Sequence, residues 1–305
     1  MKKIFTTLAL LTSLTCLAQT AGEQAQTFEN AKTAVANMRI GWNAGNRLDS
    51  NSGDVNNMWI EAWTERKPAN YETAWGQPQI TRELIHMFKE AGFNAIRVPV
   101  TWYPHMGRVI VDPSKTNWQA IWDNTTWTGY DIDKKWMARV KEVVDYVIDE
   151  GMYCILNVHH DTGDGNTAWL RADMEVYEKQ KERFEALWTK IATEFRDYGE
   201  RLVFEGYNEM LDSYGSWCFA SFAAPNNYNA TAARSAYDAI NSYAQSFVNA
   251  VRATGGNNTE RNLVVSTYGA CCGEGTWNPH LQDPLKEMKL PEDNTDGHII
   301  LEVHT

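Results

Sequence analysis

Short apolar runs alternate with longer amphipathic stretches along most of the chain. The runs, of which Tyr153 to Val158 is the clearest, are almost continuously apolar, as strands are in a parallel sheet covered on both faces. The amphipathic stretches predict helices. The predicted strands are 39–43, 93–98, 153–158, 202–206, 262–266 and 298–303, and the predicted helices are 81–91, 134–150, 175–198, 232–253 and 281–289.

This alternation of strands and helices permits either an open doubly wound sheet or a closed barrel. No glycine-rich nucleotide-binding motif follows any predicted strand, which removes the main support for the open sheet. The segments after the strands are long and rich in Trp, Asn, Asp and Gly, as are the loops that carry the active site of a barrel. We therefore predict an α/β fold, a (β/α)8 TIM barrel. About six of its units lie in residues 19–305, and the last two are expected to be missing from this chain.

Charge and the first residues of the chain narrow the possible partners. The formal net charge of −11 disfavours nucleic acid and anionic membrane surfaces. Lys2 and Lys3 precede an apolar run, Ile4 to Leu17, that is too short to span a bilayer. This pattern predicts a signal peptide, residues 1–18, and a secreted or periplasmic protein. No later run is apolar for long enough to be a transmembrane helix, and no cofactor is predicted.

Four cysteines follow the predicted signal peptide. Cys154 lies inside a strand-like run and is expected to be a buried, unpaired residue. Cys218 could pair with Cys271 or Cys272, because export permits disulfides, but the sequence leaves the connectivity open.

Polar and aromatic residues gather where the predicted strands end. In a closed barrel these ends converge on one ring. Arg97 interrupts an otherwise buried run, and a buried guanidinium needs a carboxylate partner, most naturally from another strand end. The residues at the strand ends are Trp42, Asn43, Arg97, His159, His160, Asn208, Glu209 and His304.

Glu209 carries the strongest chemical signal. A carboxylic acid at a strand end suits the general acid of a glycosidase if partial burial raises its pKa, and the neighbouring Asn208 amide can bind a sugar hydroxyl. An isolated Asn-Glu pair is otherwise an ordinary solvated turn. Its place among the other strand ends favours the catalytic interpretation.

His159 and His160 could bind either a metal ion or a substrate. Neighbouring residues on a strand point to opposite sides, so these two would not easily share one ion. We therefore predict hydrogen bonding to sugar and carboxylate groups, and no metal site. The segment around Trp75 could be an ordinary loop with Trp75 as a lid over the core, but we predict that Trp75 binds substrate. Further tryptophans follow the strands and could form a stacking platform, although about half are expected to be structural; they are Trp42, Trp102, Trp127, Trp169 and Trp217.

Six segments, in this order, resemble glycoside hydrolase family 5, the cellulase family, and cover nearly all of the chain after the signal peptide. There are departures: Met210 stands where the family usually has Pro, and Ala44 where it often has Leu. The matching segments are Gly41-Trp42-Asn43-Ala44-Gly45-Asn46-Arg47-Leu48-Asp49, Glu72-Thr73-Ala74-Trp75-Gly76-Gln77-Pro78, Ala91-Gly92-Phe93-Asn94-Ala95-Ile96-Arg97-Val98-Pro99-Val100, Val158-His159-His160-Asp161, Phe204-Glu205-Gly206-Tyr207-Asn208-Glu209 and Val303-His304.

The resemblance implies a retaining double-displacement mechanism. Glu209 would be the general acid/base, and Asn208 would hold the sugar 2-hydroxyl. Arg97, His159 and His304 would order the nucleophile and the sugar. The family's nucleophilic Glu lies on the seventh strand and is absent from this chain, and neither Glu274 nor Glu302 matches its position. The 305-residue chain alone is therefore expected to have little activity.

The sequence thus predicts an endo-acting hydrolase of β-1,4-glucosidic bonds that takes part in polysaccharide catabolism. Its substrate would be a β-glucan, and the complete protein would be a monomer. Xylanase, mannanase and xyloglucanase activities stay open within the family. A non-catalytic glycan-binding protein and a metal-dependent barrel hydrolase are the alternatives from other classes.

Overall fold

A computed structural model describes residues 27–106, 108–111, 120–123, 131–214, 228–276 and 278–305. The predicted signal peptide lies outside these residues, as do Trp127, Trp217 and Cys218. Within the described residues, no helix combines the length and apolar character needed to cross a membrane. Cys154 is buried and unpaired as expected, and Cys271 and Cys272 form no disulfide with another described cysteine.

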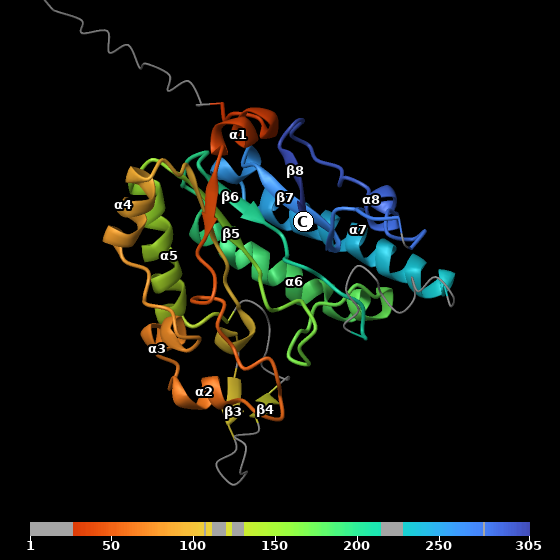
Figure 1. The fold of residues 1–305 in the computed structure, drawn as a ribbon, viewed down its shortest axis with the longest axis horizontal. Coiled ribbons are helices and arrows are strands. Elements are labelled where there is room, and N and C mark those ends of the chain that lie inside the picture. Colours follow the sequence, from red (N-terminus) through yellow and green to blue (C-terminus); the bar gives the residue numbers. More distant parts are fainter. Residues whose placement is uncertain (1–26, 107, 112–119, 124–130, 215–227, 277) are drawn as a thin grey trace, which may run out of the picture.

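The six predicted strands form one parallel sheet that curls as part of a (β/α)8 barrel (Figure 1). They pair in the order β1-β2-β5-β6-β7-β8. The register sets Asn43 beside Arg97 and Asn157 beside Glu205, so these polar residues lie level with each other across the sheet. The strands are β1 (Gly41–Asn43), β2 (Ala95–Val98), β5 (Tyr153–Asn157), β6 (Leu202–Glu205), β7 (Leu263–Cys271) and β8 (Ile299–His304).

Helices cover the outer face of this sheet (Figure 1). All five predicted helices are present, and each of the four long ones begins at a side chain that caps its first turn, such as Asp133, which accepts from the backbone of Lys135 and Trp136. They are α4 (Arg82–Glu90), α5 (Lys134–Asp149), α6 (Met174–Glu194), α7 (Ala230–Ala253) and α8 (Asp283–Glu287).

Several short elements were not predicted. Three are helices, two are 3-10 turns, and two strands pair as an antiparallel hairpin in the long connection between β2 and α5. They are α1 (Ala31–Met38), α2 (Trp59–Trp63), α3 (Pro68–Thr73), η1 (Tyr103–His105), β3 (Arg108–Val111), β4 (Ala120–Asp123) and η3 (Gly256–Thr259).

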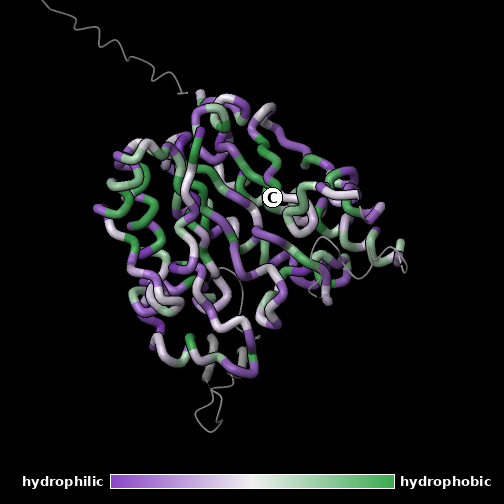
Figure 2. The backbone as a smooth tube through the Cα atoms, in the orientation of Figure 1, coloured by the Kyte–Doolittle hydropathy of each residue, from purple (hydrophilic) through white to green (hydrophobic). Residues whose placement is uncertain are grey.

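The main core lies between the sheet and the helices. Leu156 and Phe204 of the strands pack there with Trp188 of α6 and Phe247 of α7, all fully buried. A Cβ atom at position 206 would lie 2.8 Å from the Phe247 ring, so a glycine is needed for α7 to approach the end of β6. Figure 2 shows that the central strands are largely hydrophobic and that hydrophilic positions gather in the outer loops.

A second, smaller apolar cluster lines the inside of the curled sheet. Ala95, Tyr153, Val203 and Val264 meet there, and Ala34 of α1 packs on them from the N-terminal end of the strands. Because side chains of one strand face share a spacing of two residues, the next inward positions are Arg97, Ile155, Glu205 and Ser266. The interior therefore changes from apolar to polar toward the C-terminal ends of the strands.

Candidate active site

The guanidinium of Arg97 organises the polar end of the interior. It donates to both oxygens of Glu205, at 2.7 Å and 2.6 Å, and to Oδ1 of Asn208 at 2.8 Å and of Asn43 at 3.2 Å. A carboxylate oxygen of Glu302 lies 3.8 Å away. Arg97 thus has the carboxylate partner from another strand that its burial requires.

Glu205 is fully buried, which raises its pKa, while the ion pair with Arg97 opposes that shift. The ion pair in turn raises the pKa of Arg97, although burial alone would lower it. Two charge-assisted bonds of this length require an ionised acceptor, so the pair is a buried salt bridge. A third bond to Glu205 comes from the amide of Asn157 at 2.9 Å.

His304 links two carboxylates at the end of β8. Its Nδ1 lies 2.8 Å from Glu209, and its Nε2 lies 3.0 Å from Glu302. These two bonds raise the pKa of His304 to about 9, so the imidazole carries a proton at neutral pH. The side chain of Glu209 is 29% exposed and faces this cluster. Glu209 and His304 are therefore brought together, within reach of a ligand from solvent.

The hydrogen bonds of Asn157 fix the tautomer of His159. Oδ1 of Asn157 accepts from the backbone of Val100 at 3.1 Å, so its Nδ2 is the atom that faces Nδ1 of His159 at 2.9 Å. Nδ1 must then accept, and the proton lies on Nε2. Burial lowers the pKa of His159 well below its ordinary value, so the ring is neutral. It offers one N–H donor at Nε2.

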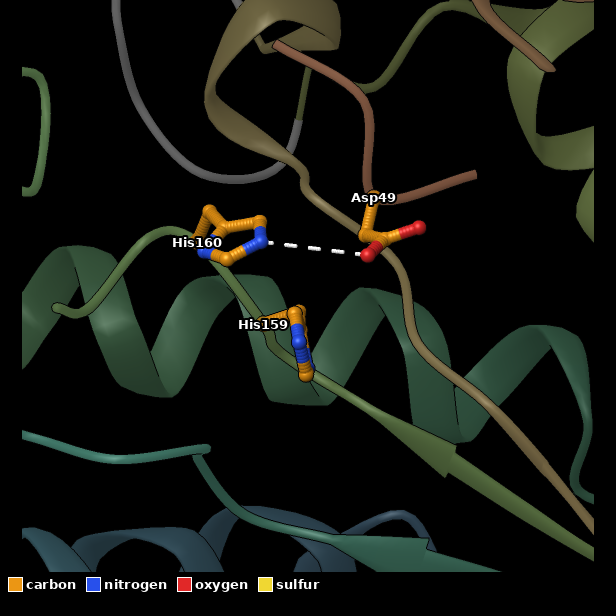
Figure 3. A group of neighbouring side chains, drawn as sticks. All are labelled: Asp49, His159 and His160. Carbon is orange, nitrogen blue, oxygen red and sulfur yellow. Dashed lines mark ion pairs between the residues drawn. The ribbon is translucent and has the colours of Figure 1, made fainter. Parts of the chain in front are cut away.

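His160 lies beside His159, which corrects the expectation that the two rings point to opposite sides. Strand β5 ends at Asn157, so the alternation of a strand does not reach them, and their rings meet edge-to-face at 4.5 Å. His160 Nε2 is 3.8 Å from Asp49 (Figure 3). Burial lowers the pKa of His160, so this contact is not an ion pair at neutral pH.

Asp49, His159 and His160 bring their ligand atoms within 4.8 Å of one another, and among the residues that the structure describes they are the group that could hold a metal ion (Figure 3). The hydrogen bonds that these residues already make oppose the binding of a metal ion. Nδ1 of His159 accepts from Asn157, and its Nε2 carries the proton. Both oxygens of Asp49 already accept backbone N–H groups, from Arg47 at 2.7 Å and from Asn46 at 3.0 Å. This donor set does not fit a metal ion.

The tryptophans separate into two groups. Trp75 lies beside His160, with ring centroids 5.5 Å apart, and so borders the cluster. Trp42 is a correction, because its ring stacks on Phe88 of α4 at 4.0 Å, on the side of β1 opposite to Asn43. Two further candidates for the platform, Trp102 and Trp169, are buried and therefore structural.

The sequence analysis did not predict a site role for Asn157, Glu205 or Glu302, and it considered Glu302 only as a nucleophile that does not match the family's position. The alternation of side chains could have indicated Glu302, because it precedes His304 by two residues and so shares its face. Asn157 and Glu205 are neighbours in the register of β5 and β6, which the sequence alone does not give. Together the cluster offers a carboxyl group that can exchange a proton, ordered amide and imidazole donors, and a bordering aromatic ring.

Comparisons with known proteins identify the family of the chain. The family model described as Cellulase (glycosyl hydrolase family 5) matches residues 55–305. Endoglucanase B of Neocallimastix patriciarum is 32% identical over 93% of this chain and 50% of its own length. Cellulase/esterase CelE of Acetivibrio thermocellus is 34% identical over 88% of this chain and 26% of its own length. This chain thus spans half or less of the length of these two relatives.

Solved structures are similar as well. A GH5-4 broad specificity endoglucanase from an uncultured bacterium is 50% identical, with a TM-score of 0.78 over 92% of this chain and 68% of that one. PbGH5A, a glycoside hydrolase family 5 enzyme from Prevotella bryantii B14, is 42% identical, with a TM-score of 0.72 over 91% and 66%.

Proposed function

The chain belongs to glycosyl hydrolase family 5, and on that premise we propose that it carries the general acid/base of an endo-acting hydrolase of β-1,4-glucans. The observation that carries the proposal is the position of Glu209. Its carboxyl group belongs to the loop that follows β6, is partly exposed, and faces the cluster built on Arg97.

Glu209 would protonate the leaving oxygen of a glycosidic bond and later activate water. His304, 2.8 Å away and with a pKa of about 9, holds a proton that it can share with Glu209. A retaining mechanism needs a second carboxylate about 5–5.5 Å from the first. We assign no nucleophile among the described residues, because Glu205 and Glu302 are both engaged by Arg97 or His304.

The other residues would bind the sugar. Arg97 occupies Oδ1 of Asn208, which leaves the amide hydrogens of Asn208 to donate to a sugar hydroxyl. His159 would donate through Nε2–H. Trp75 would stack on a sugar ring, with His160 beside it and Asn43 at the edge of the cluster.

The names of the structural neighbours support a β-1,4-linked glucan backbone. One GH5-4 endoglucanase was solved with cellotriose, and PbGH5A was solved with a xyloglucan tetradecasaccharide. Xyloglucan is therefore the second candidate substrate. Another neighbour, PbGH26A-GH5A of Prevotella bryantii, is named an endo-beta-mannanase/endo-beta-glucanase, and this chain covers 34% of it.

Calorimetric titration of the protein with cellotetraose, xylotetraose, mannotetraose and a xyloglucan oligosaccharide tests the substrate class. We expect binding of the two glucan ligands and at least tenfold weaker binding of the others. Equal or stronger binding of xylotetraose or mannotetraose would contradict the proposal. Reducing-end assays with the same ligands then separate hydrolysis from binding.

We also propose that the protein is exported after cleavage behind Ala18, and that the complete protein is a monomer. The support for export is Lys2 and Lys3 followed by the apolar run to Leu17. N-terminal sequencing of the mature protein should begin at Gln19, and retention of Met1 in an exported form would contradict this site. Light scattering would test the monomer.

A further inference from the structure

A turn between α3 and α4 carries Trp75 to the edge of the candidate site. Gly76, with φ of 78°, follows Trp75 directly and gives the turn a conformation that other residues rarely adopt. The half-buried Trp75 ring meets His160 edge-to-face. The position of this ring therefore depends on what holds the two ends of the turn, Glu72 and Ile80.

One guanidinium holds both ends. Arg139 of α5 donates to Glu72 through Nε at 2.8 Å and through Nη2 at 2.9 Å, and Nη2 also donates to the backbone oxygen of Ile80 at 2.6 Å. The backbone N–H of Ile80 donates back to Glu72 at 3.0 Å. Glu72 is fully buried, so its carboxylate depends on these partners.

A second arginine holds the same turn from the other side. Nε of Arg47 donates to the backbone oxygen of Pro78 at 2.9 Å. The backbone N–H of Arg47 donates to Asp49, which faces His160. The turn is thus anchored to α5 on one side and to the surroundings of His160 on the other.

We propose that Glu72 is a positioning residue for glycan binding, and that it acts through Arg139 to hold Trp75 beside His160 as a sugar-stacking ring. The inference rests on the proposed function and adds a residue outside the cluster on Arg97. Glu72 itself lies behind the turn and contacts no sugar. Its loss weakens the hold on both ends of the turn at once, because Arg139 and the N–H of Ile80 share its carboxylate.

A double-mutant cycle on cellotetraose affinity tests this role. Trp75→Ala should weaken binding roughly tenfold, on the scale of truncating one aromatic anchor. Glu72→Gln, which keeps the size of the side chain but loses the ion pair, should weaken binding by a similar factor. The two changes together should weaken it no further, because both remove the same contact.

The matched control is Glu142→Gln. Glu142 is an exposed second partner of Arg139, at 2.6 Å, and does not touch the turn. We expect this variant to bind cellotetraose as the wild type does. If Glu72→Gln shows no cooperative thermal unfolding, Arg139→Lys takes its place in the cycle with the same expected result.

The outcomes distinguish a failure of the role proposed for Glu72 from a failure of the proposed function. Losses that multiply in the double variant would show that Glu72 does not act through Trp75. A Glu72→Gln variant that melts earlier but binds normally would show that the ion pair serves folding alone. A wild-type protein that binds no glucan ligand would instead overturn the proposed function, and the role of Glu72 with it.

Discussion

Replacing Arg97 with Met removes the charge at the centre of the cluster while keeping much of the side-chain volume. Glu205 would then be a buried carboxylate, 1% exposed, whose remaining hydrogen-bond donor among the described residues is Asn157. Removing one partner of a buried ion pair costs about 3–5 kcal/mol. Since whole domains are stable by about 5–15 kcal/mol, the Arg97→Met variant should lose a large share of its free energy of unfolding.

The double variant Arg97→Met/Glu205→Leu tests whether the unpaired charge of Glu205 causes the loss of stability. Because it leaves no unpaired charge at position 205, it should recover most of the loss, except about 1 kcal/mol for each hydrogen bond that Asn157, Asn208 and Asn43 no longer make. In the single variant, burial without Arg97 raises the folded-state pKa of Glu205 above its unfolded value. The stability of the Arg97→Met variant should therefore increase as the pH falls through the folded-state pKa of Glu205.

Urea unfolding followed by circular dichroism, at pH 7 and pH 5, measures these differences for the wild type and both variants. A loss below about 1 kcal/mol for Arg97→Met at pH 7 would refute the buried ion pair. A double variant as unstable as the single one would refute the assignment of the loss to Glu205.

The remaining predictions concern chemistry, pH, metals and packing. Glu209→Gln should lower whatever rate of glucan hydrolysis the wild type shows by about 10²–10⁴-fold, with affinity unchanged within a few-fold in calorimetry. Glu209 and Glu302 raise the pKa of His304 to about 9. The folded state therefore gains stability from protonated His304, fully below the unfolded pKa of about 6.5, and loses it as the pH rises through 9. The melting temperature of His304→Gln should lack this decline with pH. EDTA or added Zn²⁺ should leave the melting temperature unchanged, since the His159 tautomer opposes a metal ion; a rise of several degrees with Zn²⁺ would contradict it. Trp42→Ala should lower the melting temperature without changing glucan affinity, because its ring packs on a helix.

Much of the fold follows from local patterns. The strands and long helices were predictable because each apolar run or amphipathic stretch carries its own signal. Helix α1 was missed because only Ala31 and Ala34 are buried in it, so it has hardly any apolar stripe. Strand β7 runs on to Cys271, past the predicted end at 266, through Gly269 and Ala270, whose φ values are positive and which no strand pattern includes.

The candidate site was predictable only in part. An arginine in a buried run, such as Arg97, indicates that a carboxylate partner is needed. The sequence does not indicate which one, because the strand register that makes Glu205 the partner is set by tertiary structure. Strand alternation was applied where it does not hold, at His159, which lies beyond the end of β5. Strand alternation does hold at Trp42 but was not applied there. If Asn43 faces the interior, its neighbour Trp42 must face away from it.

The most direct test of the account is a crystal structure of the protein with a bound cello-oligosaccharide. We predict that the carboxyl group of Glu209 lies within hydrogen-bond distance of a glycosidic oxygen, with an adjacent sugar hydroxyl on the amide of Asn208. A sugar bound elsewhere on the protein, or a Glu209 side chain turned away from the bound ligand into solvent, would contradict the assignment.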